Sequence, residues 1–176
     1  MICITIQHKD VYEQLKSIGT YRSTGEFTAE SLVKAYKFMQ REFNWKSTPI
    51  FLAPVGYNVE MGGATFEYDY IAIELDIPPE LVKVQEYYNW SDFIYFLDNK
   101  DEFRDSFGDS FKTVEDWGKT ILDDVLDPTL NIPYQVCVEE LRYEWVTDVS
   151  DYISIISDEH NNSGGNNKLK RLFKYI

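Results

Sequence analysis

Few residues in this chain have the types and spacing that catalysis requires. The two cysteines and two histidines do not share any of the close spacings of a zinc site. The sequence also contains no phosphate-binding glycine loop, no dinucleotide fingerprint and no nucleophile elbow. We therefore expect no metal, and any active site must be assembled from residues that lie far apart in the sequence. The four metal-type residues are Cys3, His8, Cys137 and His160.

Isolated polar residues at the ends of predicted strands are the first candidates for chemistry. His8 follows a predicted strand and could act as a general base or a substrate anchor. Its neighbours Lys9 and Asp10 favour a solvated position at the start of a helix instead. Glu139 and Glu140 are adjacent at a strand end, so regular β geometry points them to opposite faces. One of them could enter a cleft as a base, while the other meets solvent.

Cysteines and tyrosines offer a second set of candidates. Cys3 and Cys137 lie in apolar runs, which predicts inert core thiols in a reducing, cytoplasmic compartment. Tyrosines could stack on a base or a nicotinamide, although packing against the core is the more common use of this side chain. The tyrosines considered for stacking are Tyr21, Tyr36, Tyr57, Tyr68 and Tyr70.

The elements that must position these residues follow from hydrophobic periodicity. Short β-branched runs alternate with segments whose apolar residues recur every three or four positions. This mixed order predicts an α+β fold with a mixed or antiparallel sheet. We expect strands near 2–6, 49–55, 70–77, 134–138, 145–149 and 153–156, with helices near 10–18, 29–43, 91–97 and 113–125. The first helix would be capped by Asp10 and would stop at Gly19.

The chain is long enough for one compact domain. We expect that domain over residues 1–157, followed by a flexible polar linker over 158–167 and a basic amphipathic tail over 168–176. The acidic segment 98–109 reads as a solvated connection. No apolar stretch reaches the length of a membrane span, which predicts no membrane contact.

The chain is strongly acidic, with 30 acidic residues and 17 basic ones. This charge supports a second hypothesis about its function. Such a surface repels phosphate backbones, which disfavours direct nucleic-acid binding and favours a basic protein partner. The chain could be an interaction protein, encoded by a phage, that inhibits a host protein by mimicking nucleic-acid charge. The alternative is that the acids only solvate helices. The basic tail could dock on the acidic body of the same or a neighbouring molecule, giving self-association.

Five short segments, which cover most of residues 1 to 150, form a pattern of their own. They are Thr5-Ile6-Gln7, Ala35 to Met39, Pro49-Ile50-Phe51, Ile77 to Trp90, and Ile132 to Gln135. Together they resemble an uncharacterised bacterial and phage family, known as a domain of unknown function. That family has tryptophans where this chain has Phe51 and Leu52. The resemblance implies a domain length and little chemistry.

The order of elements also resembles a distant ADP-ribosyltransferase core, in which NAD lies in the cleft of a split sheet. The resemblance implies that Gln7 or His8 binds the ribose and that Tyr36 stacks on the ligand. Gln135 or Glu139 would then occupy the late catalytic position and stabilise the sugar cation. If Gln135 fills that position, the required charge is missing and the protein would only bind a nucleotide.

Overall fold

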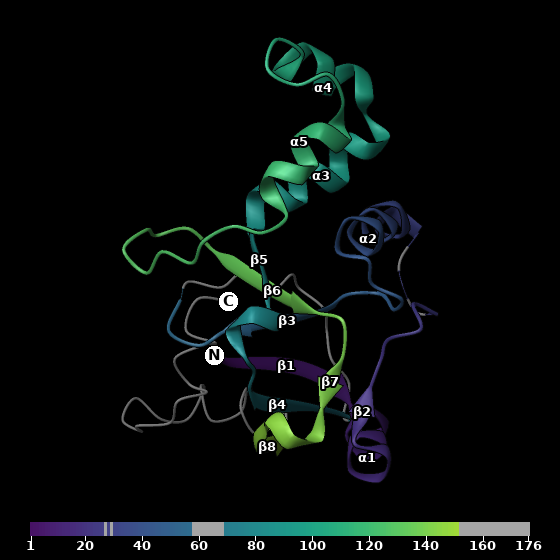
Figure 1. The fold of residues 1–176 in the computed structure, drawn as a ribbon, viewed down its shortest axis with the longest axis vertical. Helices are drawn as coiled ribbons and strands as arrows, with labels where there is room; N and C mark the ends of the chain where they lie inside the picture. Colours follow the sequence, from purple (N-terminus) through teal and green to yellow (C-terminus); the bar gives the residue numbers. More distant parts are fainter. Residues whose placement is uncertain (27, 29, 58–68, 152–176) are drawn as a thin grey trace.

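The computed structural model describes residues 1–26, 28, 30–57 and 69–151, and of positions 30 and 31 it describes the backbone only. Six strands form one sheet in which every neighbouring pair is antiparallel (Figure 1). The predicted α+β class is thereby confirmed, and of the two predicted sheet types, mixed or antiparallel, the structure has the antiparallel one. In spatial order the strands are β5 (Lys83–Glu86), β6 (Tyr134–Val138), β3 (Ile50–Pro54), β1 (Ile2–His8), β4 (Tyr70–Asp76) and β8 (Val146–Asp151).

The remaining described elements are one small sheet and seven helical segments. The small sheet pairs β2 (Thr20–Tyr21) with β7 (Leu141–Arg142). None of the helices in the described ranges is both long and apolar enough to cross a bilayer. The helices are α1 (Lys9–Ile18), α2 (Glu30–Phe43), α3 (Tyr87–Asp98), α4 (Lys100–Phe107) and α5 (Val114–Ile121), with short 3₁₀ turns η1 (Pro79–Leu81) and η2 (Tyr143–Trp145).

The sheet consists of two three-stranded halves with a short junction. β1 pairs with β4 over seven residues, but it pairs with β3 only at Cys3–Pro54 and Ile4–Ala53. Beyond these two pairs a side chain links β1 to β3: the Thr5 hydroxyl donates to the Phe51 backbone carbonyl at 3.1 Å. The six strands nevertheless remain one hydrogen-bonded sheet.

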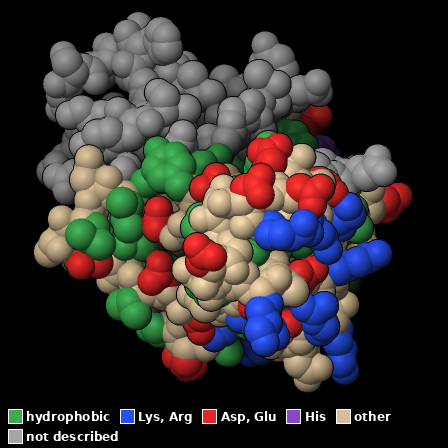
Figure 2. Space-filling view, turned by 90° about the horizontal axis from the view of Figure 1, so that it is seen from above, with side chains coloured by type: hydrophobic (Ala, Val, Ile, Leu, Met, Phe, Trp, Pro, Cys, Tyr) green, Lys and Arg blue, Asp and Glu red, His purple; other side chains and the backbone are tan. Residues whose placement is uncertain are grey.

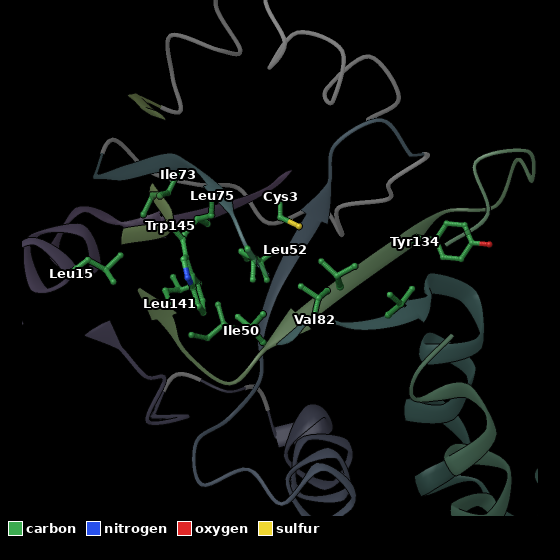
Figure 3. Close-up of a cluster of buried hydrophobic side chains, with 14 of the residues drawn as sticks. Cys3, Leu15, Ile50, Leu52, Ile73, Leu75, Val82, Tyr134, Leu141 and Trp145 are labelled. Atoms are coloured by element: carbon green, nitrogen blue, oxygen red, sulfur yellow. The ribbon is translucent and has the colours of Figure 1, made fainter. Parts of the chain in front are cut away.

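Strand alternation divides the core into two hydrophobic clusters, one on each face of the sheet. Leu52 points into the first cluster, which is mostly aliphatic and extends to Leu15 of α1 (Figure 3). Val136 belongs to the same cluster. Cys137 points to the opposite face, where the second cluster is rich in aromatic residues from α2, α3 and α5. Consecutive residues of β6 therefore face different clusters.

The helices α3, α4 and α5 project from the β5 and β6 edge of the sheet (Figure 1). We call residues 87–127, which include these helices and the turn after them, the helical arm. The prediction that residues 98–109 form a solvated connection is wrong, because α4 occupies most of that segment. Its Phe103 is 3% exposed and stacks on Phe107. Only one face of this short helix is buried, and the acidic residues around Phe103 made its hydrophobic pattern hard to see in the sequence.

The linker over 158–167 and the basic tail over 168–176 lie outside the described residues, and so do most of the glycine-rich 56–63 segment and the apolar 153–156 segment. The domain boundary at residue 157 stays a prediction.

Candidate functional site

Gln7 belongs to the first cluster's face of the sheet, because it follows Cys3 and Thr5 at alternate positions on β1. Its Nε2 donates to the Thr5 hydroxyl at 2.8 Å, and that hydroxyl donates to the Phe51 carbonyl. This chain of hydrogen bonds lies where β1 and β3 separate. Gln7 therefore has a structural use as a clamp on the sheet junction.

His8 points to the opposite face from Gln7 and lies at the start of α1. Its Nδ1 accepts a hydrogen bond from the Asp10 backbone N–H at 3.3 Å and lies 3.2 Å from the Asp10 carboxylate. The ring also meets Tyr70 edge to face at 5.7 Å. The side chain is 43% exposed. This is the helix-start position that the sequence favoured, and an imidazole acceptor here satisfies one of the free N–H groups of the first turn.

Tyr36 lies on α2 and packs its ring on Phe51, with ring centres 5.5 Å apart. Burial raises the pKa of its phenol to about 12. Burial also raises the pKa of the Cys3 thiol to about 12 and raises that of Cys137. These groups are protonated at neutral pH, and neither thiol has the thiolate character of a nucleophile.

Gln135 lies on the face of the sheet that α2, α3 and α5 cover, two residues before Cys137. Its direct partner across the strand pair is Gln85 of β5, which is fully buried. Gln85 Nε2 donates to the Leu122 carbonyl at 3.0 Å, whereas Gln85 Oε1 is buried without a partner among the described residues. Gln135 Nε2 is likewise buried and unpaired there. An unused donor and an unused acceptor thus lie on adjacent strands in register.

Glu139 is occupied at the end of β6. Its Oε1 accepts from the Lys46 backbone N–H at 2.7 Å, and its carbonyl accepts from the Ser47 hydroxyl at 2.8 Å. These bonds hold the connection between α2 and β3 against β6. Glu139 therefore orders a turn.

Glu140 is the other of the two adjacent glutamates considered from the sequence, and it forms ion pairs with two arginines. Arg22 and Arg142 each place two nitrogens near its carboxylate, at 2.7 to 2.9 Å. Burial alone would raise the pKa of Glu140, but hydrogen bonds from Arg142 and Arg22 outweigh burial and hold that pKa below its ordinary value. An open hollow of about 470 Å³ adjoins this group, lined by Gly19, Thr20, Glu140, Arg142, Tyr143 and Glu144.

The five predicted site residues do not converge. Gln7 lies on the face of the first cluster, whereas Tyr36 and Gln135 lie on the opposite face, with α2, α3 and α5. His8 and Glu139 are engaged at two separate turns. Among the described residues, no group of three or more histidine, cysteine or acidic side chains could hold a metal ion.

Unlike these residues, the acids of the helical arm are largely outside ion pairs. The arm carries eleven acidic and four basic residues, a net charge of −7 out of −13 for the chain. Four of the eleven acids form ion pairs: Asp98, Asp101, Glu115 and Asp123. Within the described ranges the other seven form none: Asp92, Glu102, Asp105, Asp109, Asp116, Asp124 and Asp127.

The surface seen from the end of the arm is divided by charge. Lys and Arg side chains gather on one side, whereas Asp and Glu side chains are distributed more widely and lie among hydrophobic side chains on the other side (Figure 2). The arm therefore presents carboxylates without neighbouring cations over part of its surface.

Comparisons with known proteins add no further evidence, since no family model, curated protein or solved structure matches this chain. The resemblances drawn from the sequence stay predictions.

Proposed function

We propose that this chain is an acidic interaction protein whose helical arm binds a basic protein surface. The observation that carries the proposal is the set of seven arm carboxylates that are outside ion pairs among the described residues. Basic surfaces of the complementary kind are what nucleic-acid-binding proteins use to contact phosphates. Binding there would exclude nucleic acid from the partner, as a phage-encoded inhibitor would do in the cytoplasm.

The arm is suited to this role because a packed aromatic core supports its surface. Phe96, Phe107 and Trp117 form mutual ring contacts with centres 5.2 to 6.0 Å apart. The same aromatic cluster continues to Phe38 on α2 and to Cys137 on the sheet. A packed support of this kind fixes the positions of the surface carboxylates before binding, which lowers the entropic cost of association.

A displacement assay tests the proposal. A basic DNA-binding domain is loaded with a fluorescent duplex, and the chain is added at rising sodium chloride concentration. We expect the chain to release the duplex at low salt and to lose this effect steeply as salt screens the contacts. Retention of the duplex at every protein ratio, with several unrelated basic domains, would contradict the proposal.

NAD or nucleotide binding is the second candidate, favoured by the unpaired amide of Gln135 and its neighbour Gln85. Ligand atoms that reached both amides would satisfy the unused donor and acceptor together. Thermal-shift titration with NAD, ADP-ribose and other nucleotides tests this function, since a ligand of the native state raises its apparent stability. A saturable shift that Gln135→Leu abolishes would support it, and the absence of any shift would count against it.

A further inference from the structure

The outer face of α3 carries an aromatic and acidic stripe. The inner face of this helix buries Trp90, Phe93 and Leu97. Tyr88, Asp92 and Tyr95 follow one another at spacings of four and three, which places them together on the opposite face. Tyr88 is 51% exposed and Tyr95 is 48% exposed. Two large rings at the surface with a carboxylate between them are an unusual use of solvent-facing helix positions.

The contacts of Tyr95, Glu102 and Tyr88 determine which groups the stripe can offer to a partner. The Tyr95 hydroxyl donates to Glu102 of α4 at 2.7 Å, and this hydrogen bond raises the pKa of the phenol. Tyr95 therefore stays neutral and offers its ring face, with Glu102 held beside it. An ionised carboxylate accepts several hydrogen bonds, so Glu102 retains acceptor capacity for a partner. Tyr88 meets Tyr87 edge to face, with ring centres 5.9 Å apart.

The N-terminal end of the stripe concentrates negative charge. Burial raises the pKa of Glu86, and repulsion from Asp124 and Asp92 raises it further. The Asn89 side-chain amide donates to Glu86 at 2.6 Å, and no ion pair of the described residues involves any of these three carboxylates. A cation brought to this end would relieve the repulsion, and among the described residues it would find no other cation to displace.

We propose that Tyr88, Asp92, Tyr95 and Glu102 form a docking stripe for an arginine-rich, extended segment of a partner protein. The inference rests on the proposed function and assigns its contact surface. A planar guanidinium group can stack flat on a tyrosine ring and pair with a carboxylate through two hydrogen bonds, whereas a lysine ammonium group acts on both only as a point charge. Tyr88 and Asp92 are about 6 Å apart along the helix axis. This matches the ~6.6 Å between alternate side chains of an extended strand.

The stripe is tested with labelled oligoarginine and oligolysine peptides of equal length, whose affinities for the full chain are measured by fluorescence anisotropy. The variant Tyr88→Leu/Tyr95→Leu removes both rings and keeps apolar side chains. Tyr143→Leu is the matched control, because Tyr143 is 44% exposed on the η2 turn, away from the arm. Tyr95→Phe keeps the ring and removes the hydrogen bond to Glu102. Near-ultraviolet circular dichroism checks that each variant is folded.

We expect the wild type to prefer oligoarginine, and the double variant to lose about five- to twentyfold in affinity together with that preference. Tyr143→Leu should bind like the wild type, and Tyr95→Phe should lose less than the double variant. Unchanged oligoarginine affinity in the double variant would overturn the stripe. The proposed function would still stand if neutralising other arm acids abolished binding.

Two further results would also overturn the inference. Equal affinities of the wild type for arginine and lysine peptides would show that peptide binding depends on net charge alone. A change in oligomeric state on the double substitution, without a change in peptide affinity, would make a second copy of the chain the occupant of the stripe. Absence of peptide binding by the wild type would contradict the proposed function as well.

Discussion

Glu140 in the sheet body and Glu86 at the base of the helical arm are both partly buried carboxylates, yet their surroundings act on them in opposite directions. Two arginines hold the pKa of Glu140 below its ordinary value. Burial and two neighbouring carboxylates raise the pKa of Glu86. The body uses its acidic residues to fasten turns, as Glu139 and Glu140 do. The arm leaves seven of its eleven carboxylates outside ion pairs among the described residues, which is why we propose the arm as the interaction surface.

The two regions also differ in the composition of their cores. Ile73, Leu75 and Val136 represent the aliphatic cluster of the body, whereas Phe93, Phe103 and Trp117 represent the aromatic cluster of the arm. The clusters lie on opposite faces of one sheet, and β6 contributes to both. We therefore expect the body and the arm to unfold together, despite their different composition.

The largest expected effect comes from removing one tryptophan from each core. Trp117 in the arm and Trp145 in the body are both 7% exposed. Substitution of either by alanine should lower the free energy of unfolding by about 3–5 kcal/mol, because each leaves a large cavity. Urea unfolding followed by far-ultraviolet circular dichroism and by fluorescence measures the effect. Separate transitions for the two probes in Trp117→Ala would show that the arm is an independent unit.

Gly118 of α5 gives the next largest effect. A Cβ atom at this position would lie 2.4 Å from the Phe93 ring and 2.9 Å from the Phe38 ring. Gly118→Ala should therefore destabilise the chain by about 1–3 kcal/mol, although alanine is the better helix former by ~1 kcal/mol. The melting temperature reports the sign directly. A higher melting temperature would mean that the arm is more loosely packed against α2 than described.

Glu140→Gln should cost about 1 kcal/mol at neutral pH, a value reduced because both arginine partners are about half exposed. The folded-state pKa is lowered, so this stabilisation is complete above the ordinary pKa of 4.5 and is lost as the pH falls. Urea titrations at neutral pH and in acid should thus show a difference between wild type and variant that shrinks in acid. A difference independent of pH would contradict the ionic origin.

Glu86→Gln should have the smallest effect and the opposite sign, a gain of a few tenths of a kcal/mol at neutral pH. The folded-state pKa is raised, so the charged carboxylate destabilises the fold above that pKa, and the gain disappears as the pH falls. The same titrations measure it, with Glu80→Gln as an exposed control. A loss of stability at neutral pH would show that the hydrogen bond from Asn89 outweighs the repulsion.

Hydrophobic periodicity was sufficient to predict the fold class, because β1, β4 and β6 are strong β-branched runs and α1 ends at Gly19 as expected. The N-cap of α1 lies two residues earlier than expected, since His8 and not Asp10 is the cap. The helix α4 was missed because acidic residues surround Phe103 and Phe107. Its helical form depends on tertiary packing, which local composition does not reveal.

The candidate site was less predictable than the fold. Gln7 and Gln135 look alike as polar residues in strands, but only the strand register shows that they lie on opposite faces. Gln85 was missed because β5 has four residues, too few to show alternation. The acidic charge of residues 98–127 was visible in composition. Which of those carboxylates lack a cation depends on contacts such as Lys34–Asp98 and Lys83–Asp123, which join distant segments.

Two variants with the same net charge test most directly whether the arm is the interaction surface. The arm variant neutralises exposed acids outside ion pairs by the substitutions Asp92→Asn, Asp105→Asn, Asp109→Asn and Asp116→Asn. The body variant changes four exposed acids elsewhere by Glu26→Gln, Asp69→Asn, Glu80→Gln and Asp148→Asn. In the duplex-displacement assay we expect the arm variant to lose displacement and the body variant to keep it. Equal loss in both variants would show that net charge alone acts, and would contradict the assignment of the interaction surface to the arm.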